Sequence, residues 1–161
     1  MIFFADTDIL SAFAKAGAIK YLKQLCADLK ISPAIYEELV RAKHAGYSFV
    51  YEIITNVEII LLTEEEYKSF KNLLESRKDL HEGECQLIVL CTSRNGILLT
   101  NDKAVKKYCN KNNIDFLDLE EILRALKLRK ILKHEKLKKL IEDIEKKDLT
   151  IIKSKEDILG D

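Results

Sequence analysis

Ile2-Phe3-Phe4-Ala5-Asp6-Thr7-Asp8 and Ile97-Leu98-Leu99-Thr100-Asn101-Asp102 are the two stretches of sequence that decide the fold. Each is a short apolar run of the kind that forms a buried strand, and each ends in a carboxylate. In open parallel sheets, ligands bind outside the carboxyl ends of the strands. If both runs are strands of one such sheet, Asp6 and Asp102 emerge at the edge where a metal site would be built.

The composition indicates one globular domain. The chain has 161 residues and is 47% hydrophobic, so it is long enough to bury one core and too short for two comfortable domains. Lysine plus arginine and aspartate plus glutamate both total 27, so total charge alone argues for no polyanionic partner. The charge is unevenly distributed, because residues 122–147 are strongly basic whereas residues 1–121 carry a net negative charge.

Cysteine usage and hydropathy indicate the compartment. The four cysteines lie far apart and form no Cys-x-x-Cys pair, which favours free buried thiols in a reducing compartment over a zinc site or disulfide framework. No run of 18 apolar residues occurs, and no signal-peptide pattern follows Met1. We therefore expect a soluble cytoplasmic protein that does not associate with a membrane.

Strand patterns alternate with helical patterns, which predicts an α/β fold with a central parallel sheet of about five strands and helices on both faces. The expected strands are Ile2–Ala5, Leu29–Ile31, Val57–Leu62, Ile97–Thr100 and Ile114–Leu117. The expected helices are residues 9–25 with a break near Gly17, one opened by Ser32 and Pro33, one opened by a capping box at Thr63–Glu66, one from Glu82 that ends at Gly96, and Lys103–Lys111.

The tail has a different pattern. Beyond residue 121, leucine and isoleucine recur at helical spacing between lysines and arginines. This pattern predicts a C-terminal extension of two amphipathic helices, after which Thr150-Ile151-Ile152 packs back on the domain.

Two further acids, Glu38 and Glu84, stand in expected helices where they could join Asp6 and Asp102. Two carboxylates about 4 Å apart repel by roughly 4 kcal/mol at an effective dielectric near 20, so four in one pocket would protonate or bind cations. An all-carboxylate set suits Mg²⁺ or Mn²⁺, and such ions activate water when a phosphodiester is cut. The chemistry therefore predicts a nuclease, although capping or solubility would explain any one acid taken alone.

Four motifs, in this order along the chain, resemble the PIN-domain family, which includes ribonuclease toxins of the VapC type. They are Ala5-Asp6-Thr7-Asp8-Ile9-Leu10-Ser11-Ala12-Phe13, Ser32-Pro33-Ala34-Ile35-Tyr36-Glu37-Glu38-Leu39-Val40, Gly83-Glu84-Cys85-Gln86-Leu87-Ile88 and Leu98-Leu99-Thr100-Asn101-Asp102. The resemblance implies a three-layer α/β/α fold, with a PIN-like nuclease domain over residues 1–121. Residues 122–161 would form the helical extension, packed on the same domain.

The resemblance also implies roles for single residues. The positions that match the family's catalytic, metal-binding acids are Asp6, Glu38, Glu84 and Asp102. In this scheme Asp6, Glu84 and Asp102 hold one or two Mg²⁺ or Mn²⁺ ions, and Glu38 coordinates the metal or orients the attacking water. Thr100 supports the site through its hydroxyl, with Asn101 as a polar neighbour.

Asp8 departs from the family pattern, which more often has Ser, Asn or Thr at that position. The added carboxylate is expected either to contact the metal or to cap the following helix. As a whole, the resemblance implies endonucleolytic cleavage of RNA by an activated water, a homodimer, and an antitoxin protein as partner.

The basic tail has two interpretations that the sequence leaves open. Its side chains could bind RNA phosphates beside an otherwise repulsive acidic pocket, or they could form the solvated face of amphipathic helices. The candidate RNA-binding residues are Arg124, Lys127, Arg129, Lys130 and Lys133.

Two other functions are also open. The Asp6-Thr7-Asp8 motif is similar to haloacid-dehalogenase-type phosphatases, in which the first aspartate is a nucleophile and the second an acid and base. That function leaves Glu38 and Glu84 without a role. The second is a non-catalytic PIN-like scaffold that binds RNA or a protein, although a binding-only protein gains nothing from the mutual repulsion of four acids.

Overall fold

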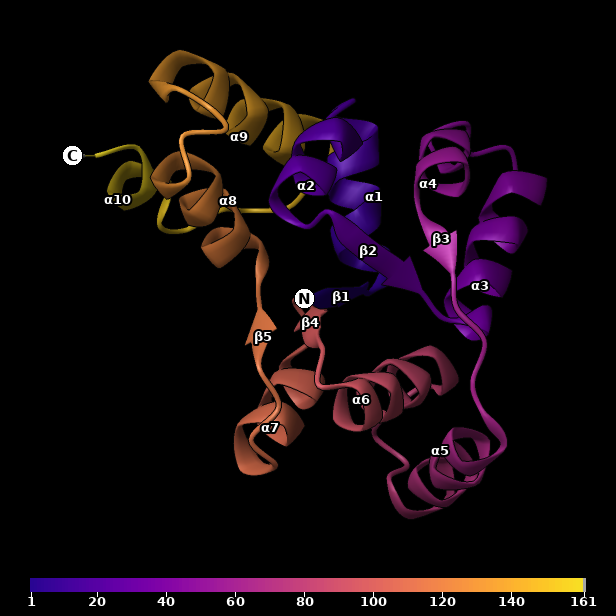
Figure 1. Ribbon diagram of the computed structural model, residues 1–161. Coiled ribbons are helices and arrows are strands. Elements are labelled where there is room, and N and C mark those ends of the chain that lie inside the picture. Colours follow the sequence, from indigo (N-terminus) through magenta and orange to yellow (C-terminus); the bar gives the residue numbers. More distant parts are fainter. Residues whose placement is uncertain (161) are drawn as a thin grey trace.

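A five-stranded parallel sheet forms the centre of the protein, as the computed structural model of residues 1–160 shows (Figure 1). The strands are β1 (Ile2–Ala5), β2 (Asp28–Ile31), β3 (Glu58–Ile59), β4 (Ile97–Leu99) and β5 (Phe116–Leu117). Their order across the sheet is β3-β2-β1-β4-β5, and every neighbouring pair is parallel. The chain adds strands to one side of β1 and then to the other, so the topological switch point lies between β1 and β4. Ligands of open α/β sheets bind at such a point.

Helices cover both faces of the sheet, which confirms the three-layer α/β/α class (Figure 1). They are α1 (Thr7–Lys15), α2 (Ile19–Leu25), α3 (Pro33–His44), α4 (Val50–Asn56), α5 (Glu64–Ser76), α6 (Glu82–Arg94), α7 (Lys103–Lys111), α8 (Leu119–Leu128), α9 (His134–Asp148) and α10 (Lys155–Leu159). In Figure 1, α1, α2, α8 and α9 lie on one side of the strands and α5, α6 and α7 lie on the other. No helix within residues 1–160 is long and apolar enough to cross a membrane.

The predicted third strand is shorter than expected. Only Glu58 and Ile59 pair with β2, although the apolar run continues to Leu62. The reason lies in the neighbouring strand, because β2 ends at Ile31 and Pro33 already begins α3. Beyond Ile60, whose N–H still donates to the Ile31 carbonyl at 2.9 Å, the run has no ladder partner.

One helix prediction needs correction, and one helix lies where the sequence predicts none. The unpredicted helix is α4. Its N-cap residue is Phe49, which makes no capping hydrogen bond, so the sequence carries no start signal for this helix. Helix α6 ends at Arg94, and the residue that caps it in the left-handed conformation, with a φ of 52°, is Asn95 and not Gly96. Gly96 has a packing role instead, because a Cβ there would lie 2.7 Å from Cε2 of Phe4 in β1.

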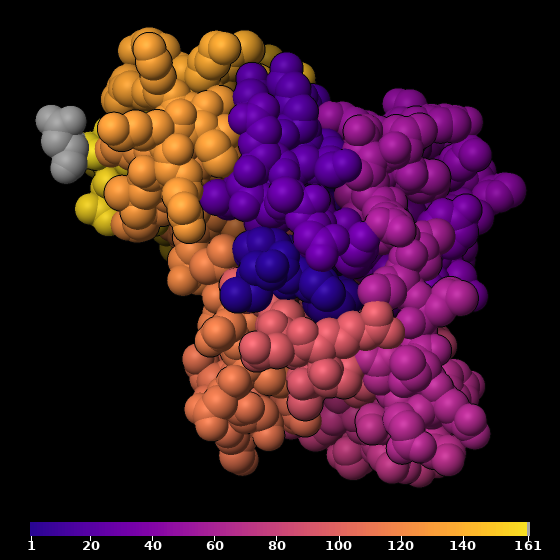
Figure 2. Space-filling view, in the orientation of Figure 1, coloured from indigo at the N-terminus to yellow at the C-terminus, as the bar shows by residue number. Residues whose placement is uncertain are grey.

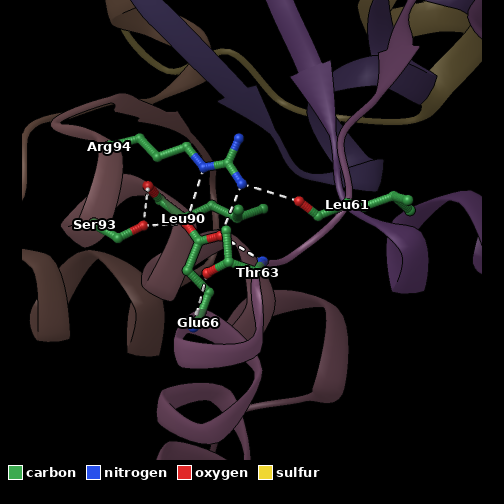
Figure 3. A network of polar contacts seen from close by, with 6 residues as sticks. All are labelled: Leu61, Thr63, Glu66, Leu90, Ser93 and Arg94. Carbon is green, nitrogen blue, oxygen red and sulfur yellow. Dashed lines mark hydrogen bonds and ion pairs between the residues drawn. The ribbon is translucent and has the colours of Figure 1, made fainter.

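An ion pair between buried Glu66 and partly buried Arg94 links α5 to α6 (Figure 3). The capping box at the start of α5 forms as predicted, with the Thr63 N–H donating to Glu66 Oε1 at 2.8 Å. The same Glu66 carboxylate, 4% exposed, accepts hydrogen bonds from Arg94 Nη2 at 2.7 Å and Nε at 2.9 Å, and from the Ser93 hydroxyl. These hydrogen bonds, led by those from Arg94, lower the pKa of Glu66 to about 2. Arg94 also donates a hydrogen bond to the carbonyl of Leu61, which holds the segment between β3 and α5 in place.

The C-terminal helices pack on the N-terminal ones. Helix α9 buries Leu137, Leu140, Ile141 and Ile144 and lies against α1, and the space-filling view shows the N-terminal residues in indigo directly beside the C-terminal residues in orange (Figure 2). Ile152 is buried as well, so the segment after α9 returns to the domain. The expected division after residue 121 falls inside α8, which begins directly after β5.

Candidate metal centre

Asp6 lies at the carboxyl end of the central strand and caps α1. Its Oδ1 accepts the N–H of Asp8 at 3.3 Å, and its Oδ2 accepts the Thr100 hydroxyl at 3.1 Å. The side chain is 9% exposed, because the apolar strand β1 must run through the core to reach this edge. The sheet therefore holds an aspartate, in one defined orientation, at the switch point of the fold.

Asp102 follows the neighbouring strand and has the same local role. It caps α7, where its Oδ1 accepts the Val105 N–H at 2.9 Å, and its own N–H donates to the Thr100 hydroxyl at 3.1 Å. Thr100 is fully buried and so links the two aspartates through one hydroxyl group. These contacts place Thr100 where it can orient both aspartates, and its supporting role in a metal site stays a prediction.

Glu84 lies in the first turn of α6 and is 9% exposed. Its Oε2 is a buried oxygen without a hydrogen-bond partner within residues 1–160, and its Oε1 lies 3.9 Å from Nε2 of His81. Buried polar atoms are almost always hydrogen-bonded, so an unpaired carboxylate oxygen needs an explanation such as an ion or water. Among the candidate acids of the described chain, Glu84 is the one with a buried oxygen that no hydrogen bond satisfies.

Glu38 reaches the same edge from α3. The hydroxyl of Thr7, the first residue of α1, donates a short hydrogen bond to Glu38 Oε2. A Cβ at Gly83 would lie 3.2 Å from Glu38 Oε1 and 2.8 Å from Cδ1 of Ile35. Glu38 therefore lies against the start of α6, and Gly83 permits this approach because it has no side chain.

The electrostatics show that these carboxylates act on one another. Burial, then repulsion by Asp8, raises the pKa of Asp6 to about 6, with a smaller contribution from Glu38. Burial, then repulsion by Asp102 and also by Asp6, raises the pKa of Glu84 to about 7, against which His81 lowers it. When they are ionised near neutral pH, these carboxylates repel one another, and a bound cation would reduce that repulsion.

The donor set fits a hard divalent cation. No three Asp, Glu, His or Cys side chains in the described part of the chain lie close enough together to form a ready-made metal cluster. Mg²⁺ does not require one, since it commonly keeps several waters and binds through only one or two carboxylates. The unpaired Oε2 of Glu84 is an available oxygen ligand.

The two less certain candidates differ in their surroundings. Asp8 is solvent-accessible, but the surrounding protein removes part of the hydration of its carboxyl. This desolvation, then repulsion by Asp148 and Asp102, raises the pKa of the carboxyl. Asn101 accepts the Leu119 N–H on its Oδ1 at 3.0 Å, so this side chain caps the start of α8. Asn101 therefore has a structural partner, whereas Asp8 faces solvent beside the site.

The basic residues of the tail divide into two groups. Arg124 pairs with Asp157 at 3.3 Å, and the Lys127 ammonium donates to the carbonyls of Ile158 and Gly160, so both hold α10 in place. The other three are exposed around the turn between α8 and α9, and they are Arg129, Lys130 and Lys133. This turn lies at the far end of α8 from Asn101, about 15 Å along a ten-residue helix.

Three residues that the sequence analysis did not single out help to form the site. Thr7 donates to Glu38, Gly83 makes room for it, and Gln86 Oε1 accepts the Ala34 N–H at 2.9 Å, which ties α6 to the start of α3. Gly83 could have been found from the sequence, because a glycine directly before a candidate acid at the start of a helix indicates that another group approaches there. Thr7 and Gln86 give none, because each acts on a residue more than 30 positions away.

The parallel sheet and its acidic edge define the protein as an α/β protein with a candidate metal site at the switch point. The chain belongs to the PIN-domain family, because the family model described as "DUF3368: PIN domain" matches residues 2–155. The resemblance predicted from the four motifs is thereby confirmed.

One solved structure with a similar fold is that of VapBC-1 from nontypeable Haemophilus influenzae. It matches with a TM-score of 0.55 and 16% sequence identity, over 73% of this chain and 98% of that chain. At this identity the likeness concerns the fold alone. No curated protein sequence matches the chain.

Proposed function

We propose that this protein is a divalent-metal-dependent endoribonuclease that hydrolyses RNA phosphodiester bonds. The observation that carries the proposal is the unpaired, buried Oε2 of Glu84, in a carboxylate whose ionisation Asp6 and Asp102 oppose. Buried acids that repel one another destabilise a fold unless they bind something positive. Membership of the PIN-domain family supports nuclease chemistry as the use of such a site.

The residues of the edge have separable roles in this proposal. Asp6, Glu84 and Asp102 are the ligands of one or two Mg²⁺ or Mn²⁺ ions, and Glu38 is a further ligand or orients the attacking water. When bound, such a cation lowers the pKa of water and neutralises charge on the phosphate. Thr100 and Thr7 orient Asp6 and Glu38 through their hydroxyl groups.

A cavity of about 380 Å³ beside Glu38 supports an extended substrate. Three acids line it, Glu37, Glu38 and Glu82, together with Arg41 and His81. Arg41 is therefore the permanent positive charge in this lining, and His81 adds to it only when it is protonated. Flanking phosphates of an RNA chain need such partners, because the carboxylates alone would repel them. We propose that Arg41 in this cavity contacts a phosphate of the RNA backbone.

The direct test is cleavage of a mixed RNA pool with Mn²⁺, with EDTA, and with Asp102→Asn. We expect cutting with Mn²⁺, no cutting with EDTA, and a loss of at least about 100-fold in the variant, the size that follows from removing a charge-stabilising group. Asp115→Asn, at an exposed aspartate remote from the edge in sequence, is the matched control and should cut like the wild type. Undiminished cutting by Asp102→Asn would remove the mechanism.

A non-catalytic scaffold is the second candidate. It predicts that RNA stays intact with Mn²⁺ while binding survives Asp6→Asn. The phosphatase alternative has less support, since the chain belongs to the PIN-domain family and that chemistry gives Glu38 and Glu84 no role. Phosphorylation of Asp6 by a phosphomonoester would revive it.

We also propose that the protein acts with an antitoxin partner and forms a homodimer. The similar solved structure is that of a VapBC assembly, and its name is what suggests a partner. Co-expression with neighbouring genes, followed by light scattering of the purified protein, tests both points. A protein that remains a monomer and whose expression does not slow growth would contradict them.

A further inference from the structure

A second cavity opens beside Asp8, and Glu38 does not line it. It has a volume of about 380 Å³ and lies between α1, the start of α8 and the end of α9. Its polar lining residues are Asp8, Ser11, Lys15, Asn101, Asp148 and Thr150. Asp8 repels the carboxylates of both Asp6 and Asp102, so the cavity borders the candidate metal centre. A nucleotide whose phosphate lies at the edge would have its sugar near this opening.

Two polar groups in the cavity lack protein partners. Ser11 is 9% exposed, and its hydroxyl makes no hydrogen bond within residues 1–160 although a helical serine can usually bond the preceding turn. The carboxylate of Asp8 likewise accepts no hydrogen bond from any described residue. Positions three apart on a helix share a face, so one donor hydroxyl and one acceptor carboxylate line the same opening. The Ser11 hydroxyl, on a residue that is nine-tenths buried, is therefore available to a ligand or water in the cavity.

The far wall of the cavity is closed by the C-terminal extension. Lys15 Nζ lies 2.9 Å from Asp148 Oδ1, where Asp148 is the last residue of α9, and the hydroxyl of Thr150 also bonds Asp148. Asp148 therefore neutralises the lysine that lines the cavity. With that charge compensated and Asp8 free, the cavity disfavours a phosphate and suits a neutral group that donates hydrogen bonds.

A ribose hydroxyl has this chemistry. A carboxylate that accepts a hydrogen bond from a 2′-hydroxyl is an established way to recognise ribose, and the 2′-hydroxyl distinguishes RNA from DNA. We propose that this cavity is a ribose subsite, in which Asp8 accepts the 2′-hydroxyl of the nucleotide next to the scissile phosphate and Ser11 donates to the same sugar. The proposal rests on the nuclease function and adds the basis of its selectivity for RNA.

The test uses one short RNA of defined cleavage position and versions with a single 2′-deoxy or 2′-fluoro nucleotide. A 2′-fluoro group cannot donate, so both changes should lower kcat/KM at one nucleotide position by roughly 10- to 100-fold, the size of one hydrogen bond to a charged group. In Asp8→Asn the ribo and deoxy substrates should be cut at rates within about threefold of each other, and Ser11→Ala should reduce the discrimination part of the way. Ser69→Ala, at an exposed helical serine of α5, is the control and should keep the wild-type ratio.

The subsite and the nuclease function can fail separately. If the wild type cuts RNA but no single 2′ change matters, or if Asp8→Asn slows all substrates in the same proportion, the subsite is wrong and the nuclease remains. If no substrate is cut, fluorescence anisotropy measures the dissociation constants of the same oligonucleotides, and these test the subsite. A preference for ribo over single-deoxy RNA that is lost in Asp8→Asn supports the subsite, whereas equal dissociation constants refute it.

Discussion

The hydroxyl of Thr100 lies 3.1 Å from Oδ2 of Asp6, a residue 94 positions earlier in the chain. The same hydroxyl accepts the N–H of Asp102 at 3.1 Å. One buried side chain therefore fixes both aspartates that end the two central strands. This contact is possible only because β4 lies beside β1, with Leu99 in register with Ala5.

Thr100→Val should destabilise the protein by about 1–3 kcal/mol, because the isosteric methyl leaves the N–H of Asp102 without its acceptor in a fully buried place. It should also raise the pKa of Asp6 further, since the lost hydrogen bond is one that lowers it. Urea unfolding at pH 7 measures the stability. Thr100→Ser keeps the hydroxyl and should lose less than half as much, and a Val variant as stable as the wild type would contradict this assignment.

Much of the fold was predictable because it depends on local signals. The apolar runs around Phe4 and Leu98 gave the central strands, and the Thr63–Glu66 capping box gave the start of α5. The length of β3 was not predictable, since it depends on where the neighbouring strand ends at Ile31.

The site divides in a similar way. The sequence could propose Asp6 and Asp102 because each follows a strand, and the four-motif resemblance added Glu38 and Glu84. It could not reveal that Thr7 bonds Glu38, or that Asp148 from α9 closes a cavity beside Asp8. Both relationships join distant segments, which no local pattern records.

Arg94→Met should destabilise the protein by about 3–5 kcal/mol at pH 7, because it leaves the buried carboxylate of Glu66 without its strongest partner. The double variant Glu66→Gln with Arg94→Met should recover part of this loss, since no uncompensated charge remains. Urea unfolding of the two single variants and the double variant measures the coupling. A double variant whose loss is the sum of the single losses would show that the pair contributes nothing as a pair.

The ion pair of Glu66 with Arg94 also predicts how the stability of the protein changes at low pH. The pKa of Glu66 is lowered to about 2 in the folded protein from an unfolded value of 4.5, so its contribution is present above about pH 4.5 and is lost as the pH falls towards 2. The loss of stability in Arg94→Met should accordingly shrink between pH 7 and pH 3. A loss of the same size at both pH values would contradict the ion pair.

The acidic edge predicts the opposite pH dependence for the metal-free protein. The pKa values of Asp6 and Glu84 are raised to about 6 and about 7, so the folded state holds protons that the unfolded state releases near pH 4. Stability from these groups is greatest below about pH 4 and is lost as the pH rises to about 7. In EDTA, Glu84→Gln should therefore stabilise the protein by about 1–3 kcal/mol at pH 7.5 and change it little at pH 4. Equal effects at both values would contradict the raised pKa of Glu84.

The exposed basic turn predicts the salt dependence of RNA binding. Replacing Arg129, Lys130 and Lys133 by glutamine should weaken binding and reduce the slope of log K against log salt concentration by about 2, as expected for three phosphate contacts on a single strand. The control replaces the exposed lysines Lys68, Lys71 and Lys78 around α5 and should leave the slope unchanged. Equal slopes for both triple variants would identify the basic turn as a solvated helix surface only.

The central claim is that the carboxylates at the switch point of the sheet, Glu84 and Asp6 among them, bind one or two divalent ions. Calorimetric titration of Mn²⁺ into the protein at pH 7.5 tests it without any substrate. We predict binding of one or two ions, with protons released because the pKa of Glu84 is raised to about 7, and at least tenfold weaker binding in Glu84→Gln and in Asp6→Asn. Mn²⁺ affinity that is the same in the wild type and in both variants would contradict the account.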